Sequence, residues 1–174
     1  MIEHRLIERM IKVMAGELER LGREKKVDHF RLDTFMDFIR TYADRCHHGK
    51  EEDILFRELR KKDIRPEHRE VMEELIQEHR WGRQATRRLV EASQAHRKGD
   101  AGALEAILAC LRELSDFYPR HIEKEDRHFF LPVMRYFNPE EKKALLEEGF
   151  RFDQNLIHEK YRQIVIQTEE EVKE

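Results

Sequence analysis

The chain has few of the features that mark membrane, secreted or disulfide-stabilised proteins. None of its apolar runs approaches the roughly 18 residues that a membrane span needs, and its first residues do not lead us to expect a signal peptide. Its two cysteines, Cys46 and Cys110, are too few for a disulfide framework, so we expect buried thiols in a reducing cytoplasm. With 7 Gly and 4 Pro among 174 residues, breaks are rare and long helices are favoured. These absences predict a single soluble, cytoplasmic domain.

The chain also lacks an excess of charge of either sign. It carries 34 Lys and Arg against 37 Asp and Glu, for a net charge of -3, and the two signs are interleaved. A basic stripe that would follow a phosphate backbone is therefore not expected, and neither nucleic acid nor a membrane is expected as a partner. The sequence contains no Gly-rich phosphate loop and no Cys-x-x-Cys pair, and no group of residues suggests a hydrolase.

What the chain does have is apolar residues at intervals of three and four, which predict amphipathic helices. Gly22, Pro66 and Gly99 stand near the expected breaks between them. The predicted helices cover roughly residues 2–21, 33–62, 67–96 and 104–132.

A further helix is expected to begin at Asn138-Pro139-Glu140-Glu141, which offers a cap, a proline and acids in the first turn. It should run to about residue 170, with Gly149 as a break. Short connections between long helices predict an all-α fold. We expect an up-down-up-down four-helix bundle over residues 1–135 and a C-terminal helical extension over residues 136–174, packed on the same domain.

Two His-x-x-x-Glu pairs stand out in these helices. His48 precedes Glu52 by four positions, and His121 precedes Glu125 by four. This spacing puts an imidazole and a carboxylate on one face of a helix, one turn apart. A neutral nitrogen together with a carboxylate oxygen is a ligand set for iron or another transition metal.

Lone histidines are expected at the same level as these pairs. If antiparallel neighbours fold about their connections, His4 lies opposite position 51 and His79 opposite position 50, and His79 also lies opposite Pro119. Burying six such polar groups without a counter-ion would cost several kcal/mol for each unpaired charge. A bound metal pair would remove that cost. The predicted ligands are His4, His48, Glu52, His79, His121 and Glu125.

The helical stripes select among neighbouring candidates. His48 and Glu52 continue into the apolar positions Leu55 and Leu59, whereas His47 and Glu51 align with charged residues on what should be an outer face. In the fourth helix the stripe through Tyr118 and His121 leads to Glu125. Asp126 is turned away by about 100°.

These residues resemble the hemerythrin-like, HHE cation-binding family. The segments EHRLIERM, CHHGKEEDILF, QEHRWGR and HIEKEDRHFFLP occur in that order and span residues 3–132. The resemblance implies a non-haem di-iron site inside a four-helix bundle, with two iron ions joined by an oxo or hydroxo bridge. By position it implies that His4 and His48 bind one iron, that His79 and His121 bind the other, and that Glu52 and Glu125 bridge them.

The chain departs from oxygen-carrying members of the family in two respects. They usually use an Asp five residues after the fourth-helix histidine; Asp126 occupies that position here, but the stripe favours Glu125. They also have a second histidine one turn after the third-helix ligand, where this chain has Arg83. One iron would then keep an open or water-filled position, which favours redox turnover over simple reversible O2 carriage. His128, His158 and Glu8 are the candidates for the missing ligand.

The resemblance implies a protein that binds or reacts with O2 or peroxide, in sensing or in detoxification. An enzymatic form would be a peroxidase- or catalase-like activity, or reduction of NO or O2 with an electron-donor protein as partner. Tyr118, one turn before His121, could donate a hydrogen bond or an electron there. The alternatives are iron storage or repair of iron centres, and a metal-free helical interaction module.

Overall fold

The fold of this protein is entirely helical wherever it is described. A computed structural model describes the backbone of residues 2–171 and the side chains of residues 2–160, and no strand occurs among these residues. The prediction of an all-α fold is confirmed. The elements are α1 (Ile2–Glu24), α2 (His29–Phe38), η1 (Ile39–His48), η2 (Glu51–Phe56), α3 (Arg57–Leu59), α4 (Pro66–Arg97), α5 (Ala103–Lys124), η3 (Glu125–Phe129), α6 (Phe130–Val133), η4 (Met134–Tyr136) and α7 (Pro139–Glu171).

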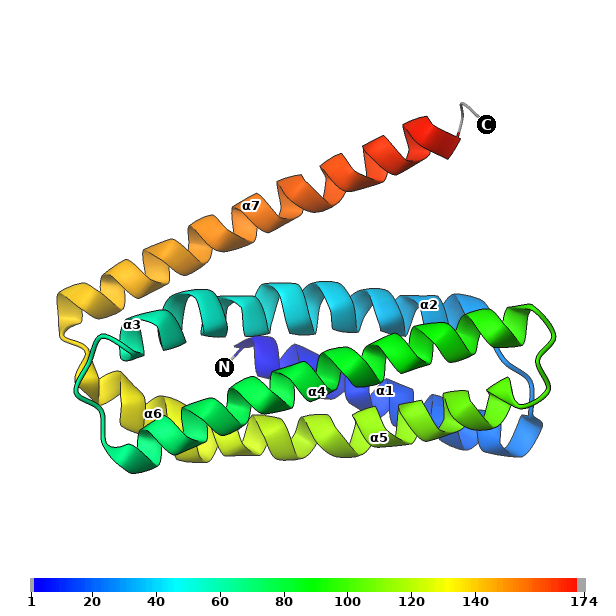
Figure 1. Ribbon diagram of the computed structural model, residues 1–174, viewed down its shortest axis with the longest axis horizontal. Coiled ribbons are helices and arrows are strands. Elements are labelled where there is room, and N and C mark those ends of the chain that lie inside the picture. Colours follow the sequence, from blue (N-terminus) through cyan, green and yellow to red (C-terminus); the bar gives the residue numbers. More distant parts are fainter. Residues whose placement is uncertain (1, 172–174) are drawn as a thin grey trace.

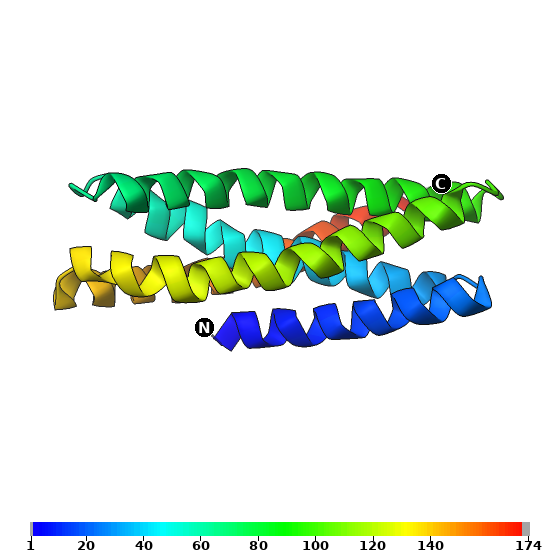
Figure 2. The ribbon, with the colours of Figure 1, turned by 90° about the horizontal axis from the view of Figure 1, so that it is seen from below.

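Several of these elements join into longer rods. Helical structure is continuous from α2 through η1 and η2 to α3, and again from α5 through η3 and α6 to η4. Figures 1 and 2 show these two rods lying beside α1 and α4 along the long axis of the molecule. Helix α4 packs against α5, and α5 against α1. Helix α7 touches η1 and η2 and runs at an angle to the rods (Figure 1).

The ends of the helices follow local capping chemistry, and three expectations about them are wrong. The second rod begins at His29 rather than near residue 33, because the Asp28 side chain accepts a hydrogen bond of 3.1 Å from the Arg31 amide. Helix α1 continues two residues past Gly22 before it ends. Helix α7 passes through Gly149 without a break, since burial and neighbouring contacts can override a glycine's weak helix propensity.

The start of α7 behaves as expected. The Asn138 side chain accepts a hydrogen bond of 2.8 Å from the Glu141 amide, and the Glu141 carboxylate accepts one of 3.0 Å from the Asn138 amide. This reciprocal pair is a capping box, which satisfies two backbone donors that a helix start leaves unpaired.

The apolar core is divided into two clusters along the rods. The larger one extends from Ile7 to Ile122 and contains much of α1, α2, α4 and α5. The smaller one gathers Phe56, Met72 and Phe129 near the other end of the rods. On α4 and on the rod from α2 to α3, buried histidines or glutamates lie between the residues of the two clusters. A buried polar layer of this kind needs partners, because unpaired polar groups in an apolar interior are costly.

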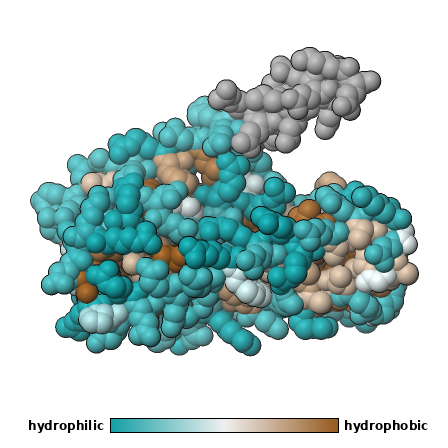
Figure 3. Space-filling model, viewed as in Figure 1, coloured by the Kyte–Doolittle hydropathy of each residue, from teal (hydrophilic) through white to brown (hydrophobic). Residues whose placement is uncertain are grey.

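The face shown in Figure 3 is mostly hydrophilic, with hydrophobic residues in separate patches. Among the described residues, no helix combines the length and the apolar character that crossing a membrane would require.

Candidate metal centre

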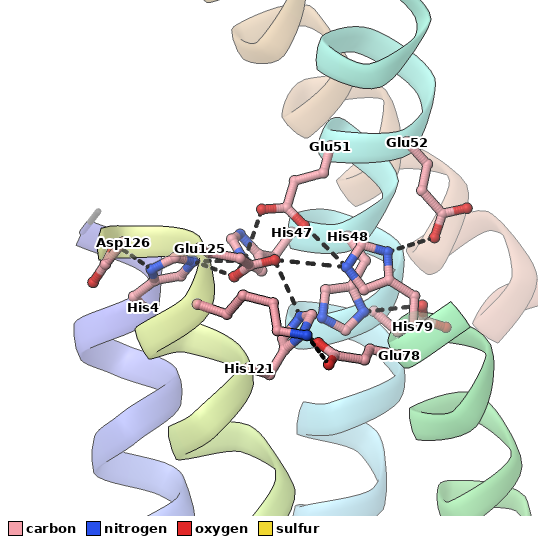
Figure 4. A network of polar contacts seen from close by, with 12 residues as sticks. His4, His47, His48, Glu51, Glu52, Glu78, His79, His121, Glu125 and Asp126 are labelled. Carbon is pink, nitrogen blue, oxygen red and sulfur yellow. Dashed lines mark hydrogen bonds and ion pairs between the residues drawn. The ribbon is translucent and has the colours of Figure 1, made fainter. Parts of the chain in front are cut away.

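Seven buried side chains form two adjoining groups in the polar layer (Figure 4). They come from four rods, which are α1, the rod from α2 to α3, α4, and the rod from α5 to η4. All seven are at most 3% exposed. Within each group, one possible ligand atom from every residue lies within 4.8 Å of the others. The first group is His4, His47, Glu51 and Glu125, and the second is His48, His79 and His121.

The Glu125 carboxylate lies between the two groups. Its Oε2 atom is 3.1 Å from His4 Nε2 and 3.9 Å from His47 Nε2. Its Oε1 atom is 3.1 Å from His121 Nε2 and 3.7 Å from His79 Nε2. Each oxygen of one carboxylate therefore faces a different group of imidazoles.

Glu51 repeats this arrangement. Its Oε1 atom is 3.4 Å from His47 Nε2, in the first group, and its Oε2 atom is 3.3 Å from His79 Nε2, in the second. In both Glu51 and Glu125, one carboxylate oxygen faces the first group and the other faces the second. This is the geometry of ligands that bridge a pair of cations. Imidazole nitrogen and carboxylate oxygen suit iron, manganese or zinc.

The hydrogen bonding of these atoms tests whether a cation fits. Among the described residues, nine buried side-chain atoms have no hydrogen-bond partner, and all but Ser115 Oγ belong to the seven side chains. Leaving a buried acceptor unsatisfied costs about 1–3 kcal/mol, and more for a charged group. Metal ions would take up the lone pairs of these atoms, so the donor set fits a pair of cations. The eight atoms are His48 Nδ1 and Nε2, both carboxylate oxygens of Glu51 and of Glu125, His79 Nε2 and His121 Nε2.

The outer nitrogens of four of the five imidazoles are fixed by carboxylates. A carboxylate can only accept, so each Nδ1 carries a proton, and Nε2 is the ring nitrogen directed at the centre. An outer carboxylate of this kind holds the ring orientation and raises the basicity of a metal ligand. The pairs are His4 with Asp126 at 2.8 Å, His47 with Glu3 at 2.9 Å, His79 with Glu52 at 2.7 Å and His121 with Glu78 at 2.7 Å.

Each outer carboxylate is held in turn by a basic side chain. This gives four chains of contacts that run from an imidazole through a carboxylate to a Lys or Arg. The basic partners are Arg5 for Asp126, Lys50 for Glu3, Arg83 for Glu52 and Lys124 for Glu78.

Proton affinities in the centre reflect the buried carboxylates. Burial lowers the pKa of His47, but Glu51, Glu125 and Glu3 outweigh it and raise that pKa to about 10. The pKa of Glu125 lies well below its usual range, because the neighbouring imidazoles outweigh its burial. Burial, with His79 and His121 nearby, lowers the pKa of His48 far below its usual value. Glu125 is therefore ionised, and protons and metal ions compete for the nitrogens around it.

The structure corrects the predicted register of the second rod. The expectation that His47 and Glu51 lie on an outer face is wrong, since they are 1% and 3% exposed. Glu52 is half-buried and outside both groups, because its Oε1 accepts hydrogen bonds from His79 Nδ1 and Arg83. The physical reason is the wide, π-helical turn of η1 and η2, in which i→i+5 hydrogen bonds place more residues in each turn than an α-helix has.

The other predicted ligands lie where they were expected, but they are grouped differently. His4, His79, His121 and Glu125 are buried in the centre, and Asp126 lies outside it on the Nδ1 side of His4. His48 lies with His79 and His121 rather than with His4, and His47 takes the place beside His4.

The third imidazole of the second group is thus His48, which sequence reasoning had assigned to the first. His128 and His158 are exposed, and Glu8 accepts a hydrogen bond from Arg5. These three candidates for the missing ligand are not in either group. The sequence contains two His-x-x-x-Glu pairs in this segment, His47 with Glu51 and His48 with Glu52. This repetition was the available signal that both histidines could lie in the centre.

Comparison with known proteins gives one match. The family model described as the hemerythrin HHE cation binding domain matches residues 1–131, which include all seven residues of the centre. No curated protein and no solved structure matches the chain.

Proposed function

The chain belongs to the hemerythrin HHE cation-binding domain family, as its sequence motifs predicted, and on that premise we propose that it is a non-haem di-iron protein that binds or reacts with O2 or peroxide. The observation that carries the proposal is that Glu51 and Glu125 each direct one carboxylate oxygen to the first group and the other to the second. A single-ion site would have no use for two such carboxylates.

The number of donors supports iron over zinc. The second group offers three imidazoles and one oxygen each from Glu51 and Glu125, which makes five donors. Structural zinc sites are almost always tetrahedral, with four ligands. A metal that accepts more than four ligands, such as iron or manganese, suits the second group better.

Once bound, a ferrous pair supplies the electrons that reduce O2 or peroxide. The residues of the chain bind, orient and shield. Phe117 stacks on the His121 ring at 5.1 Å between centroids, and Phe56 on the His79 ring at 6.0 Å. These contacts and the outer carboxylates fix the imidazoles, and an apolar cluster packs on either side of the polar layer. Tyr118 is 1% exposed and stacks at 6.3 Å from His48, where it could donate a hydrogen bond or an electron.

The finer architecture is part of the proposal. An up-down-up-down four-helix bundle over residues 1–135 would place the ligands of all four rods at the same height along the bundle axis. Residues 136–174 would form an extension, of which residues 172–174 lie outside the described part. A cytoplasmic location and an electron-donor protein as partner remain predictions from the sequence.

A second candidate is iron storage or repair of iron centres. It is favoured by the unequal groups, because the first offers only two imidazoles and two carboxylate oxygens. An ion held by fewer donors would leave more easily. A metal-free interaction module is not favoured, since it leaves eight buried polar atoms without a hydrogen-bond partner.

The test is metal analysis and the visible spectrum of aerobically purified protein, followed by stopped-flow mixing of the ferrous form with O2. We expect about two irons per chain, near-ultraviolet bands of a bridged ferric pair, and oxidation by O2 or peroxide faster than that of free iron. A colourless protein that holds zinc would overturn the O2 chemistry. Ready release of iron without reaction would favour storage or repair.

A further inference from the structure

A cavity of about 390 Å³ lies between η1, α4 and α5 and leads to the candidate metal centre. Its lining includes His48 and Tyr118, which are 2% and 1% exposed, and also Arg40 and Arg87, which are exposed on the surface. The cavity therefore connects the solvent-facing side of two helices with a residue of the second imidazole group.

His48, which lines this cavity, is chemically distinctive. Among the five imidazoles of the centre, His48 is the one whose Nδ1 has no hydrogen-bond partner among the described residues. The nearest acid is Asp44, whose Oδ1 lies 3.6 Å away and which also lines the cavity. A residue that lines a cavity and has a buried polar atom without a hydrogen-bond partner marks a place where a ligand gains a hydrogen bond.

The lining is strongly basic. It contains four arginines and one acid, which gives a formal charge of 4 - 1 = +3. Arg83 is held by Asp44 and Glu52, and Arg45 by Glu159. Arg40 and Arg87 form no hydrogen bond or ion pair with another described residue, so their guanidinium groups have donors to offer an incoming molecule.

Size separates the occupant from O2. Liquid water takes up about 30 Å³ per molecule, so the cavity has room for roughly a dozen waters, far more than a diatomic gas needs. Guanidinium groups present paired donors that match the two oxygens of a carboxylate or a phosphate. A concave site lined by apolar walls and a few convergent polar groups is the usual form of a small-molecule site.

We propose that this cavity binds a small oxyanion, a molecule that bears a carboxylate or a phosphate group, and that Arg40 and Arg87 hold it above His48. Because the cavity leads to His48 in the second imidazole group, an anion bound there would lie next to the site of the redox reaction. That last link rests on the proposed function, whereas binding of the anion does not.

The experiment measures thermal unfolding of the metal-loaded protein in acetate or inorganic phosphate, with chloride replacing each anion at constant ionic strength. A ligand that binds only the folded state raises the unfolding temperature with its concentration. We expect such a rise, and at least a tenfold weaker response in the double variant Arg40→Gln/Arg87→Gln. Stabilisation by acetate alone identifies a carboxylate, and stabilisation by phosphate alone identifies a phosphate.

The matched control is Arg112→Gln/Arg120→Gln, which removes the same charge from exposed arginines outside this cavity. It should respond as the unchanged protein does. An equal response of both double variants, or no response of the unchanged protein, would overturn the proposal. Metal content is measured in every sample, so that a chain without iron counts against the proposed function alone and the anion result is read separately.

Discussion

Two buried carboxylate sites in this protein are neutralised in opposite ways. Glu17, in α1, is 3% exposed and forms ion pairs with Arg20 at 2.6 Å and with Arg31 at 2.7 Å. Glu51 and Glu125 are equally buried, but in the described structure their ion-pair partners are imidazoles, and no Lys or Arg pairs with them.

The charge of Glu17 is balanced by arginines of the protein itself, whereas the charges of Glu51 and Glu125 would be balanced by a bound metal ion. A guanidinium is a permanent cation, whereas an imidazole can give up its proton and offer a lone pair instead. Glu17 is therefore a structural carboxylate. Around Glu51 and Glu125, the imidazole nitrogens can exchange a proton for a metal ion.

Metal removal should produce the largest contrast between the two sites. Chelation is expected to lower the free energy of unfolding by about 3 kcal/mol or more, the value for a ligand present at 100 times its Kd. The free energy of unfolding is measured by denaturant titration with and without chelator. Glu17→Gln protein should show the same drop, because its charge compensation is independent of the centre. An unchanged unfolding curve after complete metal removal would refute the assignment of the centre.

Glu51→Ala and Glu125→Ala are expected to abolish most metal binding, because each removes an oxygen from both groups. Their sequence neighbours Glu52 and Asp126 provide matched controls. Alanine at either neighbour should leave both ions bound with an affinity lowered by about 10–100-fold, as for outer carboxylates in general. Metal analysis and competition with a chromophoric chelator measure the two effects. If Glu52→Ala removed more metal than Glu51→Ala, the ligand would be Glu52, as an α-helical period predicts.

His47→Ala and His48→Ala should each affect one half of the centre. His47 belongs to the first group and His48 to the second, so each variant is expected to keep about half of the bound metal. Metal analysis by mass spectrometry measures the loss, and the exposed His128→Ala serves as the control. Full occupancy in His47→Ala together with loss in His48→Ala would show that His47 is not a ligand.

Glu17→Gln is expected to have the smallest effect and to leave metal content unchanged. Losing hydrogen bonds to charged partners should reduce the free energy of unfolding by about 1–3 kcal/mol near neutral pH. Hydrogen bonding by Arg20 lowers the pKa of Glu17 against the effect of burial, and Arg31 lowers it further. A carboxyl whose pKa is lower in the folded state stabilises the protein above its unfolded pKa of about 4.3, and this contribution is lost as the pH falls below that value.

The difference between Glu17→Gln and the unchanged protein should therefore shrink below about pH 4. Urea titrations of metal-free protein at several pH values measure it, because loss of metal at low pH would otherwise dominate. A difference that grows on acidification would show that Glu17 is not ionised in the folded state.

The family and the long helices could be predicted from the sequence because both depend on local patterns. Apolar residues at intervals of three and four follow from an α-helical period, and they correctly indicate His4, His79, His121 and Glu125 as inward positions. All four lie in α-helical segments or, for Glu125, directly after one.

The choice between His47 and His48 failed where the period itself changes. Whether a turn closes by i→i+4 or i→i+5 hydrogen bonds depends on packing around the whole rod, which no local pattern reveals. The wider turn lets two consecutive histidines serve different groups, and it moves Glu51 inward and Glu52 outward. The ligand roles of all these residues and the boundary near residue 135 remain predictions.

The span of the chain that the centre uses has a consequence for how the protein is made. His4 hydrogen bonds to Asp126, 122 positions further along the sequence, and the two groups draw on residues from 4 to 125. Closing so long a loop is entropically costly and delays the contacts that depend on it. A nascent chain on the ribosome must expose the last rod, from α5 to η4, before the first imidazole group can close, so metal can be loaded only late in synthesis.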